Sequence, residues 1–297
     1  MANPKTEFDA YVQEDLGKQK GIFHPVKAGM LERMMVKNVA ITSLHPNEED
    51  EFTFPDVGPS YRIISEYEQQ FRRALDTNQQ VFDEPLIVEK LRPQGYLILN
   101  GHHRWAAAMK VGIKKIPVRI VNLAQESDVQ KMLEASAHDK RVALDLDEVV
   151  FRPSDDPYLE RELRFPHNIK HKQRIRLGIP ALFYFLAKNG YDVWTYASNY
   201  YSIDDIKHFF KCYGVDVVGI ITGTAKPIKN KSENAVKMET LINNRYAETL
   251  HIDNDMILVT HRGSKEFEEY SLEATPEKWS KHAISVIKKI GKHEKEK

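Results

Sequence analysis

The sequence predicts an α/β protein with two domains: a larger one built on a parallel sheet with helices on both faces, and a smaller α+β domain. In the second half, apolar runs of strand length alternate with segments of helical periodicity, the pattern of a parallel sheet covered on both sides. In the first half, short strands and helices follow a less regular order. The chain has 297 residues, 41% of them hydrophobic, which is enough for a core in each half.

Changes of pattern along the chain predict four segments. A polar lead-in occupies residues 1–20, the smaller domain residues 21–121, a polar linker helix residues 122–140, and the larger domain residues 141–297. The alternating pattern begins directly after the linker with a buried strand. Each domain is therefore expected to fold around a core of its own.

The clearest element of the first half is a helix at 61–75, because its apolar residues, from Ile63 to Leu75, recur at helical spacing. A turn signal, Arg-Pro-Gln-Gly, separates two short strands, and Gly112 ends a second helix. The expected elements are strands at 36–44, 85–90, 96–99 and 116–121 and helices at 61–75 and 103–111.

Strands and helices alternate through the second half. Asn189-Gly190 is a helix end signal, and Ser202 is a helix-capping residue. The expected elements are strands at 142–146, 191–198, 217–222 and 249–253 and helices at 176–188, 202–213, 232–245 and 276–290.

The composition excludes several classes of protein. The formal net charge is zero, which does not support a nucleic-acid partner. The single cysteine, Cys212, excludes a disulfide framework and is expected as a buried thiol in a reducing compartment. The N-terminus lacks the apolar segment of a signal peptide, and no apolar run approaches membrane-spanning length. A cytoplasmic protein without a membrane partner is expected.

Two aspartates follow the first strand of the second half. The apolar run 142–144 delivers Asp145 and Asp147 to its carboxyl end, which is the edge where open α/β sheets bind ligands. A carboxylate there can act as a covalent nucleophile in phosphoryl transfer, and a second carboxyl group can supply and remove protons. For the spacing alone, a surface turn after a strand is an equal alternative.

Later strands of the second half end in groups that a phosphoryl site needs. Ser198 offers a hydroxyl, Lys226 a cation, and Asp253 and Asp255 offer acids for a hard metal ion such as Mg²⁺. For Lys226 alone, the alternative is a lysine in a solvated loop. The order of these groups, strand by strand, favours one shared site over separate surface positions.

With these residues in place, residues 141–262 resemble the haloacid dehalogenase-like superfamily of phosphatases. The resemblance implies a Rossmann-like sheet, Asp145 as the nucleophile, Asp147 as the acid and base, and Ser198 and Lys226 as phosphate-binding residues. It implies Mg²⁺ as the cofactor. The metal candidates are Asp145, Asp147, Asp253 and Asp255.

Three positions in this set have alternatives. Thr195 is a second candidate for the hydroxyl, and Asn254 competes with Asp255 for the metal. Lysines near Lys226 are the alternatives to it, although Pro227 favours Lys226; they are Lys229, Lys231 and Lys237. The segment 151–174, where such phosphatases often carry a cap, is too short for a large cap but long enough for a flap. An open site is expected, which favours a large substrate or a lid supplied by the N-terminal domain.

The other motif is Gly101-His102-His103-Arg104, which follows a strand and opens a helix. Helix N-termini bind anions, and an arginine adds a bidentate phosphate donor. The alternative is a helix start whose histidines only cap or lie exposed. With the strand before it and Ile116-Pro-Val after it, the segment 36–121 resembles the ParB/sulfiredoxin-like superfamily. The Gly-His-His-Arg form is closest to the serine-kinase branch, and sulfiredoxin chemistry is excluded because the motif lacks a cysteine.

This second resemblance implies a nucleotide, such as ATP or ADP, at Gly101, His102, His103 and Arg104. The acidic loop 48–51 holds Glu48 and Glu49, either of which is a candidate kinase base; a solvated run of charges is at least as well supported there.

Together the two motifs predict a Mg²⁺-dependent phosphatase fused to a nucleotide-binding domain, with a kinase as one reading of that domain. The phosphorylated substrate is a nucleotide, a nucleic-acid end, a phosphoprotein or a metabolite. The alternative is a ParB-like nucleotide- or DNA-binding module with the phosphatase fold as a non-catalytic scaffold. A nuclease is a third reading with less support.

Overall fold

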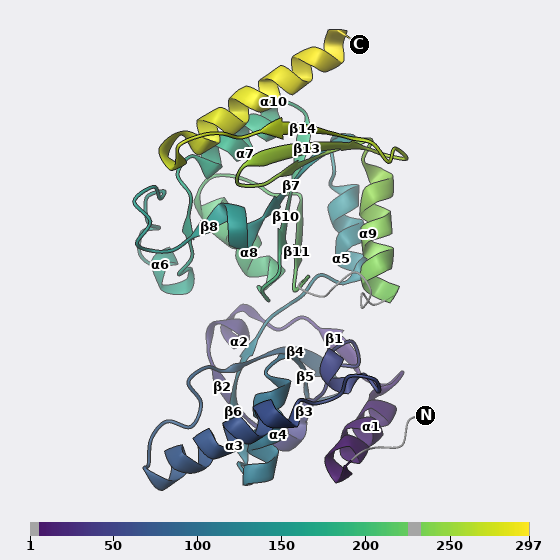
Figure 1. The fold of residues 1–297 in the computed structure, drawn as a ribbon, viewed down its shortest axis with the longest axis vertical. Helices are drawn as coiled ribbons and strands as arrows, with labels where there is room; N and C mark the ends of the chain where they lie inside the picture. The colour runs from purple at the N-terminus through teal and green to yellow at the C-terminus, as the bar shows by residue number, and fades with distance from the viewer. Residues whose placement is uncertain (1–5, 225–232, 297) are drawn as a thin grey trace. The chain divides into compact units, whose positions relative to one another are not determined.

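A computed structural model of the chain describes residues 6–224 and 233–296 and divides it after Asn122 into two units. In Figure 1 the first unit runs from purple to blue and the second from teal to yellow. Each unit has its own cluster of buried hydrophobic residues. Among the helices in the described ranges, none is both long and apolar enough to cross a membrane.

The first unit contains a mixed sheet. Its strands lie in the order β2-β6-β4-β5-β3, and β1 pairs with β4. The pairs β4–β6 and β3–β5 are parallel, and the remaining pairs are antiparallel. The strands are β1 (His24–Val26), β2 (Lys37–Ala40), β3 (Leu44–His45), β4 (Leu86–Arg92), β5 (Tyr96–Asn100) and β6 (Lys115–Ile120).

The strand predicted at 36–44 was wrong in its length. A 3₁₀ turn, Ile41–Ser43, divides it, so that β2 pairs with β6 while β3 pairs with β5 on the other side of the sheet. The run of β-branched and apolar residues gave no signal of this turn, because Ile41 is buried like its strand neighbours.

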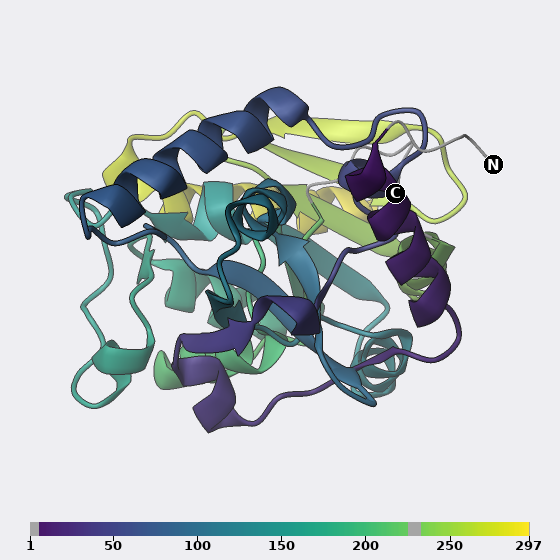
Figure 2. The same cartoon turned by 90° about the horizontal axis from the view of Figure 1, so that it is seen from below.

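Four helices complete the first unit. They are α1 (Glu7–Gln19), α2 (Met30–Met34), α3 (Tyr61–Asp76) and α4 (His102–Val111). In Figure 2 the blue helix α3 crosses the unit and the purple helix α1 lies to one side. The lead-in is part of the fold, because Val12 of α1 is buried and Phe8 packs against Trp105 of α4 with ring centroids 5.8 Å apart. Leu75, expected in the buried stripe of α3, is 51% exposed in the last turn.

The second unit contains a six-stranded sheet in the order β11-β10-β7-β12-β13-β14. The first four strands are parallel, and β13 and β14 continue the sheet antiparallel, so the sheet is mixed and not parallel throughout. The strands are β7 (Lys140–Asp145), β10 (Tyr191–Ala197), β11 (Gly219–Thr222), β12 (Glu248–Ile252), β13 (Met256–His261) and β14 (Phe267–Ser271).

Helices cover both faces of this sheet (Figure 1). Helices α7 (Ile179–Lys188), α8 (Ile203–Cys212) and α10 (Trp279–Glu296) lie on one face, and α5 (Glu126–Glu134) and α9 (Glu233–Arg245) on the other. Helix α5 falls in the segment expected as a linker. It packs against α9 and β11, and its Val129 is fully buried in the core of the second unit.

The strand order reverses direction beside β7. Strands β10 and β11 lie on one side of β7 and β12 lies on the other. The connections therefore leave in opposite directions at the β7–β12 boundary, and in such sheets ligands bind outside the strand ends at this boundary. The functional residues of the second unit are therefore expected near this end of β7.

Candidate active site

Asp145 and Asp253 end neighbouring parallel strands at the β7–β12 boundary. Leu144 of β7 is the register partner of Ile252 of β12, so the next residues, Asp145 and Asp253, lie level with each other. On the other side of β7, Asp145 is the partner of Tyr196. The structure thus brings together two of the predicted acids through strand register.

The Asp145 carboxylate is fixed by the turn that follows it. Its Oδ1 accepts hydrogen bonds from the backbone N–H of Asp147 at 2.7 Å and of Glu148 at 2.9 Å, at the start of a π-helical turn, Leu146–Val150. Burial raises the pKa of Asp145, and the carboxylates of Asp147 and Asp253 raise it further against the effect of the two N–H donors. The site therefore carries excess negative charge, which a cation would relieve.

The Asp147 carboxylate is held at both oxygens. Oδ2 accepts from the backbone N–H of Asn199 at 3.0 Å, and Oδ1 accepts from the hydroxyl of Tyr201 at 2.7 Å. Burial and this neighbouring carboxylate raise the pKa of the Tyr201 hydroxyl, which keeps it a donor. The two donors hold the Asp147 carboxyl group in one orientation, as proton transfer requires, and leave a lone pair on each oxygen.

Asn199 and Tyr201 are site residues that the sequence analysis missed. They lie in the loop after β10, next to the predicted Ser198. Their only signal in the sequence is that they follow Ser198 directly. The hydrogen bonds to Asp147 depend on how the loop turns back toward β7, which spacing alone does not show.

Of the two hydroxyl candidates, Ser198 lies at the rim, which is the edge of the sheet where the parallel strands end, and Thr195 does not. Thr195 is fully buried inside β10 and pairs with Leu144, below the level of Asp145. Its Oγ1 has no hydrogen-bond partner among the described residues. Ser198 is exposed directly after the end of β10. The rim position favours Ser198.

The lysine of the site lies outside the described residues. Lys226 and its alternatives Lys229 and Lys231 fall in the range 225–232. Lys237 is described, and its Nζ lies 2.7 Å from Glu126 Oε2, which ties it to helix α5. Lys237 is therefore accounted for by an ion pair between α9 and α5.

The acidic turn after β12 places its three polar residues differently. Asn254 Oδ1 accepts from Arg176 at 2.6 Å, and Asn254 Nδ2 donates to the carbonyl of Glu148 at 3.3 Å, which links the turn to the loop after Asp145. Asp255 is exposed at the tip, and its carbonyl accepts from Leu272 N–H at 2.6 Å. Within the described ranges, no interaction joins the Asp255 carboxylate to Asp145.

A buried arginine supports this turn. Arg176 is 8% exposed, and its guanidinium lies 4.3 Å from the centroid of the Trp279 ring. Burial lowers the pKa of Arg176 to about 10. The Trp279 indole N–H donates to the Asn254 carbonyl at 2.6 Å. Arg176 and Trp279 were not predicted as site residues, and they act on the site by holding Asn254.

The segment 151–174 forms a small flap, as its length predicted. Strands β8 (Phe151–Arg152) and β9 (Arg174–Ile175) pair antiparallel, and the loop between them contains the short helix α6 (His167–Lys170). No large cap follows β7 in the described chain.

In the first unit, Gly101 opens helix α4 in the left-handed conformation, with φ of 105°. A Cβ at this position would lie 2.7 Å from Leu86 Cγ, so both the dihedral angle and the close approach require glycine. The N-terminus of α4 is the kind of site that binds anions.

Both histidines of the motif hold backbone segments in place. His102 is buried, its Nε2 accepts from the Asn47 N–H at 3.2 Å, and its Nδ1 lies 3.7 Å from Asp50 Oδ2. His103 Nε2 accepts from the Ser60 N–H at 3.1 Å, and burial lowers the pKa of His103. His102 therefore holds the acidic loop beside the N-terminus of α4, and His103 holds the start of α3 there.

The other two predicted residues of this site differ in their surroundings. The Arg104 guanidinium donates to the Glu84 carbonyl at 2.8 Å and to Asn100 Oδ1 at 3.1 Å. It thereby links the end of β5 to the loop that precedes β4. A bidentate bond to phosphate would replace these contacts. Glu48 is exposed in the loop that His102 holds.

A family model described as the ParB N-terminal domain matches residues 62–137. The ATP-dependent L-serine kinase of Staphylothermus marinus is 42% identical over 48 residues, which are 16% of this chain and 19% of that protein. The chain thus spans about a fifth of the length of this curated relative.

Three solved structures are similar at low identity. Sulfiredoxin from Arabidopsis thaliana is 16% identical over 29% of this chain and 83% of that chain, with a TM-score of 0.23. Truncated ParB from Caulobacter crescentus with CTP-γ-S is 20% identical over 34% and 59%, with a TM-score of 0.24. A conserved hypothetical protein from Pyrococcus furiosus is 13% identical over 84% and 99%, with a TM-score of 0.24.

The family match supports the ParB-like part of the resemblance predicted for the first half. The matched range begins within α3, includes the Gly-His-His-Arg motif and extends into α5 of the second unit. The phosphatase chemistry expected of the second unit rests on the residues at the carboxyl edge of its sheet alone.

Proposed function

We propose that the second unit is a Mg²⁺-dependent phosphohydrolase of the haloacid dehalogenase-like kind, with Asp145 as its nucleophile. The observation that carries this proposal is the register that sets Asp145 level with Asp253 at the β7–β12 boundary, with Asp147 held beside them by Asn199 and Tyr201. Nucleophile, acid and metal-binding carboxylate then share one edge of the sheet.

The donor set fits Mg²⁺. Hard divalent cations take oxygen ligands, and Asp145 and Asp253 supply carboxylate oxygens from adjacent strands. Burial and the neighbouring carboxylates of Asp147 and Asp253 raise the pKa of Asp145. A cation bound among these carboxylates would stabilise the ionised form of Asp145. When bound, Mg²⁺ would offset the charge of the phosphoryl oxygens. Asp255, at the exposed tip, is the weaker candidate ligand.

In the first step, Asp145 Oδ2 attacks phosphorus, since Oδ1 is occupied by two backbone N–H donors. The bond between phosphorus and the ester oxygen breaks, and protonated Asp147 gives its proton to the leaving oxygen. An acyl phosphate on Asp145 results. In the second step a water attacks phosphorus, Asp147 takes the proton of that water, and the carboxylate of Asp145 leaves with its electron pair. Ser198 and Lys226 would bind the phosphoryl oxygens in both steps.

The small flap favours a large substrate. A phosphoprotein or a nucleic-acid end can reach an edge that no large cap covers, whereas small phosphorylated metabolites gain more from enclosure. A protein or nucleic-acid phosphoester is therefore the substrate class that the segment between β8 and β9 supports best.

The test is release of inorganic phosphate from phosphopeptides, phosphorylated oligonucleotide ends, nucleotides and sugar phosphates in Mg²⁺. We expect Asp145→Asn to lower the rate by at least about 10³-fold. Asp216→Asn is the matched control, because Asp216 is exposed before β11, at the opposite edge of the sheet. Equal phosphate release by the wild type and Asp145→Asn would contradict the proposal and support the alternative that this unit is a non-catalytic scaffold.

The first unit supports a second function, the binding of a nucleotide by its phosphates at the N-terminus of α4. The support is the glycine-only geometry at Gly101, the acidic loop that His102 holds there, and the ParB N-terminal domain match. The local identity to an ATP-dependent L-serine kinase favours ATP and makes phosphoryl transfer to a hydroxyl the specific hypothesis. Exposed Glu48 would then accept the hydroxyl proton.

Calorimetric titration with ATP, ADP and adenosine tests this site. We expect ATP to bind at least about 10-fold more tightly than adenosine, because the helix terminus recognises phosphate. Gly101→Ala should abolish binding. Gly112→Ala is the control, since Gly112 ends the same helix with φ of 83°. If adenosine binds as well as ATP, the phosphates are not what α4 recognises.

A further inference from the structure

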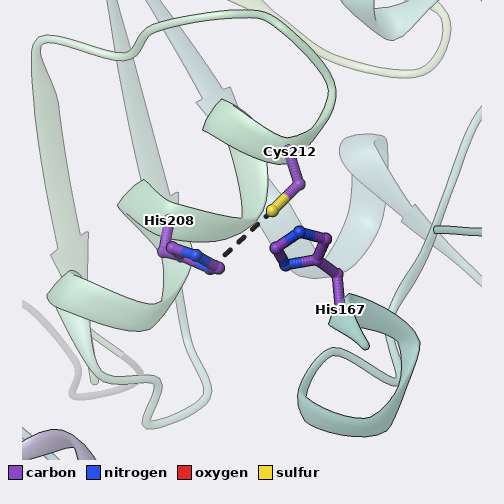
Figure 3. A group of neighbouring side chains, drawn as sticks. All are labelled: His167, His208 and Cys212. Carbon is purple, nitrogen blue, oxygen red and sulfur yellow. Dashed lines mark hydrogen bonds between the residues drawn. The ribbon is translucent and has the colours of Figure 1, made fainter. Parts of the chain in front are cut away.

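A group of histidines and the single cysteine lies away from both sites, between α6 and α8. His167 begins α6 and His171 follows its last residue, while His208 and Cys212 both lie in α8. Within each pair the residues are four positions apart, a spacing that places side chains on one face of a helix. Figure 3 shows the side chains of His167, His208 and Cys212 turned toward one another from the two helices.

The distances suit a small metal ion. One ligand atom each from His167, His208 and Cys212 all lie within 4.8 Å of one another. Tetrahedral zinc with nitrogen and sulfur ligands holds them about 3.3–3.6 Å apart. A closure of less than about 1.5 Å would therefore complete the geometry.

The fourth residue of the group can orient a ligand. His171 is buried, and its Nε2 lies 2.8 Å from His208 Nδ1. Histidines that bind metals commonly make a hydrogen bond through the other ring nitrogen, which fixes the tautomer and the ring orientation. His171 makes such a bond to Nδ1 of His208, which leaves Nε2 of His208 for the metal.

We propose that His167, His208 and Cys212 bind Zn²⁺, with His171 as the residue that orients His208. The ligand set of two imidazoles and one thiolate is one that zinc prefers and Mg²⁺ does not. A water molecule completes the coordination, since His167 is exposed to solvent. This site is independent of the carboxylates at the β7–β12 boundary.

The surroundings are compatible with a bound cation. Two lysines, Lys170 and Lys211, act on His208, and Lys170 is paired with Asp205 at 2.8 Å, so its charge is offset.

The site would anchor the loop between β8 and β9 to helix α8. Apart from the four-residue helix α6, this loop has little regular structure, and it exposes the apolar side chains of Phe165 (78%) and Ile169 (57%). A metal ion that joins α6 to α8 would hold this loop at His167, as structural zinc does in other small elements.

Because Cys212 is the only cysteine, its reactivity reports on the site without a variant. The full-length protein, treated with a chelator, is alkylated with iodoacetamide with and without added Zn²⁺. We expect Zn²⁺ to slow alkylation at least about 10-fold, and Mg²⁺ to have no effect. Asp145→Asn should show the same protection, which separates this site from the phosphohydrolase. Alkylation at equal rates with and without Zn²⁺ would overturn the proposal.

Co²⁺ in place of Zn²⁺ tests the ligands. The wild type should bind about one equivalent and show a thiolate-to-cobalt absorption band with tetrahedral visible bands. Cys212→Ser should lose the band, His167→Gln and His208→Gln should bind at least about 100-fold more weakly, and His171→Gln about 10- to 100-fold. His261→Gln, at an exposed histidine of β13, is the control. A band that survives in His167→Gln and His208→Gln with unchanged affinity would refute these ligands.

Discussion

The hydroxyl of Tyr201 donates to Asp147 Oδ1 at 2.7 Å, and with Asn199 it fixes the carboxyl group that we assign to proton transfer. If this assignment is right, Tyr201→Phe should lower kcat about 10-fold and leave KM within about twofold, because the carboxyl group loses a donor that orients it. Steady-state phosphate release measures both constants.

Tyr213→Phe serves as the control for this prediction. Its hydroxyl donates to the Arg161 carbonyl at 3.2 Å and makes no contact with Asp147. Equal kcat values for the two variants would show that Tyr201 does not position the acid.

Asp253 and Asp255 are predicted to differ in metal binding. Asp253 lies level with Asp145, whereas Asp255 is exposed at the tip of the turn. Asp253→Asn should raise the Mg²⁺ concentration for half-maximal activity at least about 10-fold, and Asp255→Asn should change it by less than about twofold. Activity measured across a Mg²⁺ titration distinguishes the two. The reverse ranking would place the metal on Asp255.

Glu32 should give the first unit a pH-dependent stability. A hydrogen bond from Lys90 is the main cause that lowers the pKa of Glu32 to about 2, followed by the Gly29 N–H. Because the folded-state pKa lies below the ordinary value, the stabilisation is complete above that value and disappears as the pH falls toward 2. Glu32→Gln should therefore lower the free energy of unfolding by about 1 kcal/mol at neutral pH and leave it unchanged in strong acid.

Urea unfolding at neutral pH and in strong acid, with pulse-labelled amides of β4 as the probe, measures the effect of Glu32. Glu14→Gln is the control, since Glu14 forms an exposed pair with Lys18 on α1. A loss of stability in Glu32→Gln that is the same at both pH values would contradict the assignment to ionic contacts.

Gly219 should tolerate no side chain. A Cβ at this position of β11 would lie 2.0 Å from Trp194 Cε3, and Trp194 is fully buried with its indole N–H bonded to Tyr246. Gly219→Ala should lower the free energy of unfolding of the second unit by at least about 2 kcal/mol. Urea unfolding followed by tryptophan fluorescence measures the change.

Gly17→Ala provides the contrast, because nothing lies within 4 Å of a Cβ at that position of α1. Alanine should stabilise this helix by about 0.5–1 kcal/mol. Loss of stability in both variants alike would point to a general cost of replacing glycine, and not to the ring of Trp194.

Several elements were predictable because their signals are local. Helix α3 follows from apolar residues at helical spacing, and α4 from the glycines at its two ends. The parallel strands of the second unit follow from the alternation of apolar runs with helices. The 3₁₀ turn Ile41–Ser43 and the exposure of Leu75 were not predictable, because each depends on which neighbour the segment meets in the fold.

The sequence by itself determined which chemical groups stand at the ends of the strands: two aspartates after β7, a hydroxyl after β10 and acids after β12. Only the tertiary structure decided which of them meet. Strand register sets Asp253 beside Asp145 and leaves Thr195 below the carboxyl edge of the sheet, and a loop turns Tyr201 toward Asp147. The segment around α6 lies beside α8, so that His167 and His208 lie near Cys212. These contacts join residues far apart in the chain, so hydrogen bonding and packing between elements fix them, and local periodicity does not.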